Sequence, residues 1–142
     1  MKISDVMTKS VETVRPDQTA RDAARFMLRA EAGSIPVCEG EKVIGMITDR
    51  DIAVRGLAEG RGPDCAVRDL MSDGIICARD DEDVAEVAQR MSDEQVRRLP
   101  VLDSSDRLVG IVSLGDLSRE TGGEAAHHAL DGVSEAGGQH QQ

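Results

Sequence analysis

Two short stretches of the chain place a hydroxyl and a carboxylate at the same spacing. Residues 45–52 read Gly-Met-Ile-Thr-Asp-Arg-Asp-Ile, and residues 110–117 read Gly-Ile-Val-Ser-Leu-Gly-Asp-Leu. Both follow one pattern: a glycine, two apolar residues, a Thr or Ser, two variable residues, an aspartate and an apolar residue. The side chains that could do chemistry are Thr48, Asp51, Ser113 and Asp116.

This pattern has two interpretations, and local chemistry leaves both open. In the first, the hydroxyl caps a helix and the aspartate three residues later completes a capping box. In the second, the same groups bind a nucleotide, because helix N-termini bind phosphate and a carboxylate can accept hydrogen bonds from ribose hydroxyls. No nucleophile, general base or metal-ligand spacing accompanies Asp49 and Asp51, so we expect no catalytic residue and no metal site.

An internal repeat shows which elements position these side chains. Three pairs of segments align at an offset of 64 or 65 residues, and the one-residue slip falls in a polar turn, where an insertion costs little. Shared anchors of this kind predict two copies of one structural unit. The pairs are 3–8 with 67–72, 34–37 with 98–101, and 43–48 with 108–113.

Each repeat is predicted to fold as β-α-β-β-α. Strands at 11–14 and 75–78 come first, and the helices after them begin at apparent capping boxes, Thr19-x-x-Asp22 and Asp83-x-x-Glu86. We expect Gly33 to end the first of these helices. Helical spacing predicts buried faces made of Ala20, Ala23, Ala24, Met27 and Leu28, and of Val84, Val87, Ala88 and Met91. The remaining strands are predicted at 35–38, 43–47, 99–102 and 108–112, and the closing helices at 49–57 and 114–119.

The predicted fold class is α/β, in detail α+β, with the two repeats packed as one pseudo-twofold module. Neither half, at about 60 residues, would bury enough apolar surface to be more than marginally stable alone. The repeats are assigned to residues 1–60 and 61–120. A C-terminal tail, 121–142, is expected to hold a helical turn or two at 124–130 and then to be flexible.

Composition excludes several classes of partner. The 142 residues include no Trp, no Tyr and one Phe, Phe26, so the core must be aliphatic and bases would have little to stack on. A net charge of −10 argues against binding nucleic acid or an anionic membrane. No apolar run is long enough for a membrane span, and the first residues lack the apolar stretch of a secretory signal.

The cysteines fit a reducing compartment. There are three, without CxxC spacing, so we expect a cytoplasmic protein. Cys38 and Cys77 lie in predicted strands and are expected to be buried, whereas Cys65 lies in the connecting loop and is expected to be the most exposed thiol.

The doubled motif resembles the cystathionine-β-synthase (CBS) domain pair, also called a Bateman module. Asp-Val-Met at 5–7 and Asp-Leu-Met at 69–71 fit that family, as do the strand-opening Ile-Pro and Leu-Pro. The resemblance covers about residues 3–119. Residues 48–51 and 95–100 resemble small stand-alone bacterial pairs of the hypoxic-response type.

The resemblance implies two clefts between the repeats, each for an adenosine-containing ligand: AMP, ADP, ATP or S-adenosylmethionine. Ribose would lie on the motif aspartate and phosphate near the motif hydroxyl. Without an aromatic stack, adenine would lie between aliphatic groups. The candidate residues are Ser34, Ile35, Pro36, Thr48, Arg50, Asp51 and Ser72 for one cleft, and Thr8, Arg97, Arg98, Leu99, Pro100, Ser113 and Asp116 for the other.

The three arginines enter this set because guanidinium binds phosphate bidentately. Each also has a simpler interpretation. Arg97 and Arg98 could form a solvated helix end, and Arg50 could pair with Asp49 at the surface.

The function these features predict is a regulatory binding module rather than an enzyme. It would self-associate as a homodimer, bind a small-molecule nucleotide, and signal to a separate, unidentified protein partner, with no role for nucleic acid or membrane. The alternative is a ligand-free dimeric scaffold that responds to oxidation or to a metal through Cys65 and the tail histidines His127, His128 and His140.

Overall fold

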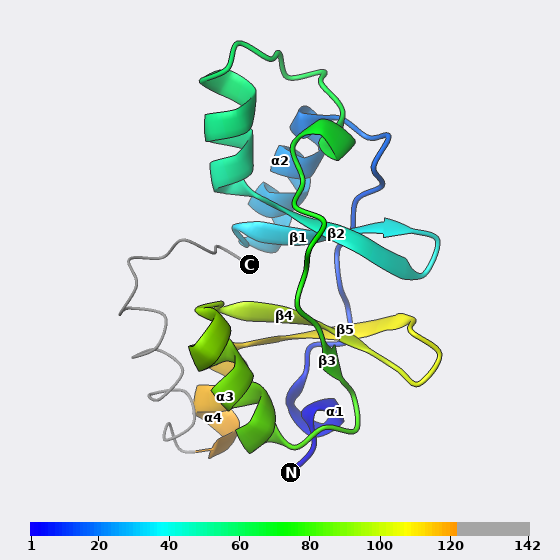
Figure 1. The fold of residues 1–142 in the computed structure, drawn as a ribbon, viewed down its shortest axis with the longest axis vertical. Coiled ribbons are helices and arrows are strands. Elements are labelled where there is room, and N and C mark those ends of the chain that lie inside the picture. Colours follow the sequence, from blue (N-terminus) through cyan, green and yellow to red (C-terminus); the bar gives the residue numbers. More distant parts are fainter. Residues whose placement is uncertain (122–142) are drawn as a thin grey trace. The chain divides into compact units, whose positions relative to one another are not determined.

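The computed structural model describes residues 1–121, with the backbone alone for 118–121. The chain forms two compact units (Figure 1). The Asp51 unit runs from Glu12 to Ile75, and the Asp116 unit joins Met1–Val11 to the residues from Ile76 onward. The helical turn and flexible end predicted within 122–142 lie outside the described residues.

The N-terminal segment belongs to the unit that is built mainly from the second repeat. Helix α1 (Ile3–Val6) buries Ile3 completely in the core of the Asp116 unit, and the Ile3 N–H donates to Glu82 O at 2.9 Å. In the same way, the short helix η2 (Val67–Asp69) buries Val67 in the core of the Asp51 unit. Each unit therefore combines the body of one repeat with the first residues of the other. We call these first residues, 1–11 and 61–75, the leading segments. The repeat boundaries, 1–60 and 61–120, stay a prediction about the sequence.

The Asp51 unit contains two longer helices and a two-stranded sheet. Its elements are α2 (Ala20–Ala30), β1 (Ser34–Glu39), β2 (Lys42–Thr48) and η1 (Asp51–Leu57). Strands β1 and β2 are antiparallel. The closing helix η1 is a π-helix, in which the Ala58 N–H donates to Ala53 O at 2.9 Å; the sequence pattern does not distinguish this winding from an α-helix.

The Asp116 unit has a three-stranded sheet in the order β3-β4-β5. The elements are β3 (Ala78–Arg79), α3 (Val84–Glu94), β4 (Arg98–Leu102), β5 (Leu108–Ser113) and α4 (Leu114–Thr121). Strand β3 is parallel to β4, and β4 is antiparallel to β5. Mixed helices and small sheets confirm the α+β class.

The predicted first strands are much shorter than expected. At 11–14 only Val14 makes a bridge, parallel to Val37. At 75–78 the strand is reduced to Ala78–Arg79, which leaves Cys77 outside it. The segment at 11–14 pairs only with β1, through Val14, and the segment at 75–78 reaches β4 only through Ala78.

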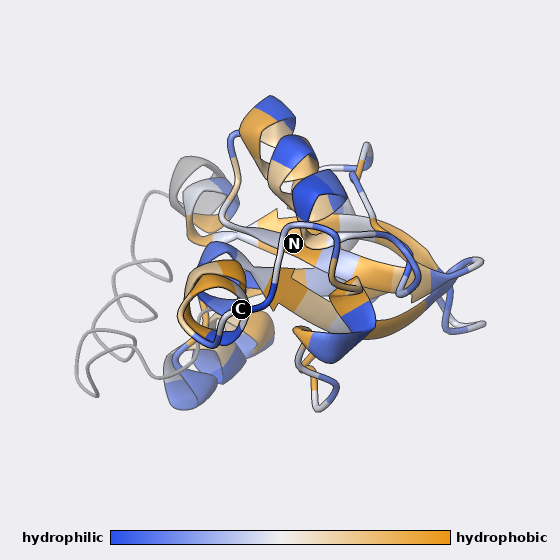
Figure 2. Cartoon of the chain, turned by 90° about the horizontal axis from the view of Figure 1, so that it is seen from above, coloured by the Kyte–Doolittle hydropathy of each residue, from blue (hydrophilic) through white to orange (hydrophobic). Residues whose placement is uncertain are grey.

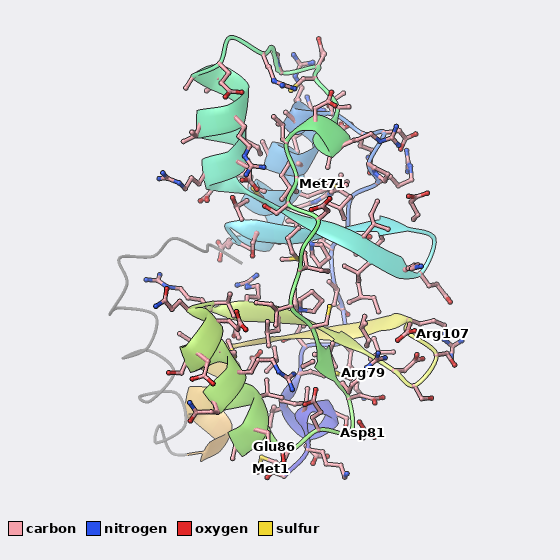
Figure 3. The ribbon with its side chains drawn as sticks, in the orientation of Figure 1. Met1, Met71, Arg79, Asp81, Glu86 and Arg107 are labelled. Atoms are coloured by element: carbon pink, nitrogen blue, oxygen red, sulfur yellow. The ribbon has the colours of Figure 1, made fainter. Side chains whose placement is uncertain are left out.

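Salt bridges hold the turn between β4 and β5. The Arg79 guanidinium pairs with Asp106 and donates to Asp103 O at 2.8 Å, while Arg107 Nε lies 3.0 Å from Asp103 Oδ2. Figure 3 shows Arg79 and Arg107 at this hairpin. Backbone N–H groups of Arg107 and Ser105 keep the pKa of Asp103 below its usual value. The extra residue of the second repeat lies in this turn.

Helix ends match the predictions only in part. The Thr19–Asp22 box forms, with Oγ1 of Thr19 accepting from Asp22 N at 3.1 Å. The Asp83 box does not form: the Asp83 side chain makes no cap and lies instead 3.8 Å from the N-terminal amino group. Gly33 does not end α2 either, because Glu31 already adopts the left-handed conformation that ends it, at φ 52°, as Gln95 does after α3.

Each unit has its own aliphatic core. Figure 2 shows apolar residues along the strands, and apolar and polar residues alternating on the helices. The predicted face of α3 is confirmed, since all four of its residues are buried. The predicted face of α2 is too wide: Ala20, Ala23 and Met27 are buried, but Ala24 is exposed and Leu28 is 81% exposed.

Candidate functional site

The motif hydroxyl and carboxylate meet in the same geometry in both units. Oγ1 of Thr48 accepts from Asp51 N at 3.0 Å, and Oδ2 of Asp51 accepts from Thr48 N at 2.9 Å. In the other unit Oγ of Ser113 accepts from Asp116 N at 3.3 Å, and Oδ2 of Asp116 accepts from Ser113 N at 3.0 Å. The capping interpretation is therefore correct in both repeats.

A capping bond occupies only one oxygen of a carboxylate. An ionised carboxylate has two oxygens and about four acceptor positions, and the capping bond uses one oxygen. Burial fixes its orientation, because the Asp51 side chain is 13% exposed and Asp116 is 5% exposed. A rigid acceptor of this kind can receive hydroxyl groups of a ligand with little loss of side-chain entropy.

The residues before each strand proline lie next to the motif hydroxyl. Strand register pairs Ser34 with Thr48 across β1 and β2, and Arg98 with Ser113 across β4 and β5. Ser34 is buried, at 6% exposure. In each antiparallel hairpin, the first residue of the first strand pairs with the last residue of the second strand.

The expected aliphatic walls for adenine do not fit the burial of Ile35 and Leu99. Both side chains belong to the cores, at 1% and 0% exposure. Their backbones remain at the strand starts, beside the motif hydroxyls. Pro36 and Pro100 are buried too but lie outside both core clusters. Only the backbone of the two aliphatic residues is left as a candidate ligand contact.

Each leading segment crosses the motif glycine of its unit. Ser72 N donates to Met46 O at 2.9 Å and Thr8 N donates to Ile111 O at 2.8 Å, so Ser72 lies in the Asp51 unit and Thr8 in the Asp116 unit. Met71 lies alongside β2 (Figure 3). A Cβ on Gly45 would come within 2.6 Å of Ser72 O. The motif glycine is therefore needed for this close backbone approach.

The three candidate arginines are available to an anion. Arg50 and Arg97 are exposed, and Arg98 is half-buried. Among residues 1–117, whose side chains the structure describes, no carboxylate oxygen lies within 4.0 Å of any of the three guanidinium groups. The expected side-chain pair of Arg50 with Asp49 is thus absent; instead the Arg50 backbone N–H donates to Asp49 Oδ1 at 2.8 Å.

The sequence analysis overlooked Arg55, which ties the Asp51 carboxylate to the leading segment. Its Nε lies 4.0 Å from Asp51 Oδ1, and its Nη1 donates to Leu70 O at 3.2 Å. The signal was the four-residue spacing from Asp51 to an Arg on the same helix. The second repeat has Glu120 at the matching position, so the two motif aspartates differ in this neighbour.

The thiols offer little to a redox mechanism. Burial raises the pKa of Cys38 to about 11 and also raises the pKa of Cys77, so both are kept as unreactive thiols. Cys65 is partly buried against the core of the Asp51 unit, less exposed than expected. No group of three potential metal ligands occurs in the part of the chain that the structure describes, and the three histidines lie outside it.

Comparison with known proteins agrees with this geometry. The CBS domain family matches residues 3–56 and 67–123. "CBS domain-containing protein YhcV" of Bacillus subtilis is 41% identical over 133 residues, which cover 93% of this chain and 94% of that protein. Hypoxic response protein 1 of Mycobacterium tuberculosis is 38% identical over 117 residues, covering 81% of each chain. None of the helices in residues 1–121 has the length and apolarity to cross a membrane.

Solved structures share the fold. A crystal structure of Hypoxic Response Protein I with two coordinated zinc ions has a TM-score of 0.78 and 34% identity, covering 84% of this chain and 98% of that one. The CBS domain pair of protein MJ0100, in complex with 5′-methylthioadenosine and S-adenosyl-L-methionine, has a TM-score of 0.75 and 31% identity, covering 87% and 97%. With two matched domains and full-length relatives, the chain belongs to the CBS domain family and carries a tandem pair of CBS domains.

Proposed function

We propose that the protein is a cytoplasmic regulatory module that binds an adenosine-containing ligand at two sites and passes the signal to a separate protein partner. The observation that carries this is the doubled motif: each unit holds a hydrogen-bonded carboxylate, buried at Asp116 and partly buried at Asp51, beside a hydroxyl where a strand meets a helix. The candidate residues group into an Asp51 site and an Asp116 site, one in each unit.

The chemistry of each site suits a nucleoside. The carboxylate can accept hydrogen bonds from both ribose hydroxyls, as acidic residues do in dinucleotide sites. The bound ligands of the MJ0100 pair, both adenosine compounds, support the same class of ligand here. No nucleophile and base are paired near either carboxylate in the described residues, which favours binding over catalysis.

Calorimetry on ligand-stripped protein tests the proposal. We expect binding of AMP, ADP, ATP or S-adenosylmethionine, reduced in stoichiometry by Asp51→Asn or Asp116→Asn and abolished by the double variant. Asparagine keeps an oxygen for the capping bond, so unfolding curves of the variants serve as the control for folding. Absence of binding to the wild-type chain at about millimolar ligand, where the free energy is only about −4 kcal/mol, would rule the function out.

The homodimer belongs to the same proposal, and the Asp51 unit offers a surface for it. Helices α2 and η1 carry three exposed apolar side chains, with Leu28 81%, Val54 45% and Leu57 72% exposed. Two adjoining grooves of about 250 and 510 Å³ run between these helices and share Ala24 and Ile52. We assign this face to a second copy of the chain.

Charges at the two grooves support that occupant. The smaller groove is lined in part by Arg21 and Arg61, and the larger by Glu31 and Asp49. A twofold axis between the grooves would bring the basic end of one copy to the acidic end of the other, as an isologous interface requires.

Leu57→Glu should convert the dimer to monomer, because it places two charges within one apolar interface. Sedimentation velocity measures the change. Ser104→Glu, in the exposed turn between β4 and β5, is the matched control and should leave the dimer intact. A Leu57→Glu protein that still sediments as a dimer would show that the dimer interface lies elsewhere. A monomeric wild type would show that the chain has no such interface.

A further inference from the structure

The two sites differ in charge at positions that correspond exactly in the fold. The repeat offset aligns Gly33 with Arg97 and Asp49 with Leu114. Hydrogen bonds verify the match, because the Asp49 N–H donates to Gly33 O at 2.9 Å and the Leu114 N–H donates to Arg97 O at 3.2 Å. Side chains at these positions therefore occupy the same place in each unit.

In the Asp51 unit this place holds a carboxylate. A Cβ built on Gly33 would lie 3.0 Å from Asp49 Oδ2, so the carboxylate covers the glycine. Its other oxygen accepts from the Arg50 N–H at 2.8 Å. An anionic ligand group would meet the Asp49 carboxylate here, beside Arg50, while the other nearby cation, Arg55, is engaged by Asp51 and by Leu70 O.

In the Asp116 unit the same place is cationic. Leu114 replaces the aspartate and packs against the core, Arg97 replaces the glycine, and Arg98 follows it. Within residues 1–121, the Gly115 N–H donates no hydrogen bond, whereas its counterpart, the Arg50 N–H, is taken by Asp49. Positions 33, 34, 49 and 50 of the Asp51 unit carry one negative and one positive side chain, whereas the matching positions 97, 98, 114 and 115 of the Asp116 unit carry two positive side chains and no negative one.

From this difference in charge we propose that the two sites take different ligands: a phosphorylated adenosine at the Asp116 site, and an adenosine compound without phosphate at the Asp51 site. The inference rests on the proposed function. Charges at equal places act on a phosphate with opposite sign, and about 1.4 kcal/mol of difference is a tenfold change in affinity. At the Asp51 site, Asp49 already occupies the position that a phosphate would take at the helix start.

Single-site proteins separate the two affinities. Asp51→Asn leaves the Asp116 site, and Asp116→Asn leaves the Asp51 site. Each is titrated with adenosine, 5′-methylthioadenosine, AMP and ATP. We expect the Asp116 site to bind AMP at least about tenfold more tightly than adenosine, with the advantage shrinking as salt increases. At the Asp51 site we expect adenosine and 5′-methylthioadenosine to bind at least as tightly as AMP.

Exchange variants test the cause. In the Asp51-site protein, Asp49→Asn and Asp49→Leu should each raise AMP affinity about tenfold and leave adenosine affinity unchanged. Asparagine keeps an oxygen for the Arg50 N–H, so agreement between the two variants identifies charge as the cause. In the Asp116-site protein, Leu114→Asp should lower AMP affinity. Glu41→Gln, in the turn between β1 and β2, is the control for net charge and should change neither.

The outcomes separate the two proposals. An identical ranking of ligands at both sites, with adenosine compounds bound, overturns the inference and leaves the proposed function standing. The inference is also overturned if the Asp51 site binds AMP no more tightly than adenosine but Asp49→Asn leaves its AMP affinity unchanged, because the charge of Asp49 is then not the cause. No binding of any adenosine compound to the wild type removes the proposed function and this inference together.

Discussion

Gly45→Ala should destabilise the chain by about 3 kcal/mol, which lowers the melting temperature by roughly 5–10 °C. The new methyl group would lie 2.6 Å from Ser72 O, which accepts from the Met46 N–H, while the Ser72 N–H donates back to Met46 O. A backbone neighbour of this kind cannot move aside as a side chain does, so β2 or the leading segment must shift. The measurement is thermal and urea unfolding of the purified variant.

Substitutions of two other glycines, Gly110 and Gly74, should destabilise the chain less than Gly45→Ala. A Cβ on Gly110 would meet Met7 Sδ at 2.6 Å and Thr8 O at 2.9 Å, so the flexible thioether can yield and Gly110→Ala should cost less than Gly45→Ala. A Cβ on Gly74 meets nothing within 4 Å, and Gly74→Ala should stay within about 0.5 kcal/mol of wild type. Equal stability of the Gly45 and Gly74 variants would contradict the close crossing.

Leu99→Ala should lower the free energy of unfolding by about 2–5 kcal/mol. The side chain is fully buried in the Asp116 core, so its loss removes apolar contacts and leaves a cavity. Urea unfolding measures the loss. Leu102→Ala, on the same strand but only half-buried and outside the core cluster, should cost about 1 kcal/mol or less.

The same variant decides what Leu99 does. If the side chain were a wall for adenine, its truncation would weaken nucleotide binding with little change in stability. Because the side chain is buried, we expect instead a large loss of stability and a smaller effect on nucleotide binding. A Leu99→Ala protein that is as stable as Leu102→Ala but binds AMP poorly would show that the side chain faces the ligand.

The sequence predicts the parts of this fold that depend on local pattern. Helical apolar spacing locates the buried face of α3, apolar segments on either side of a polar turn locate both hairpins, and the repeat locates Thr48, Asp51, Ser113 and Asp116 at matching places. Each of these follows from a local pattern: helical periodicity, a turn between apolar segments, or a capping bond three residues apart.

Features set by long-range packing are missed. Leu28 fits the spacing of a buried face but is exposed, because the stripe of α2 that packs inward is narrower than the apolar pattern. Asp49 and Gly33 are sixteen positions apart, so a linear reading cannot show that the carboxylate covers the glycine. The π-helix at η1 depends on which carbonyl each N–H selects, and helical residue preferences do not distinguish the two windings.

The exchange of leading segments has a consequence for the order in which the chain can fold during synthesis. Residues Met1–Val11 are synthesised before the segment from Ile76 onward, which holds their native partners. Ile3 therefore cannot be buried until β4, β5 and α3 have been synthesised. The residues of the Asp51 unit are contiguous in sequence, so that unit can fold earlier. Contacts of such long sequence separation slow folding and leave apolar surface open in the meantime.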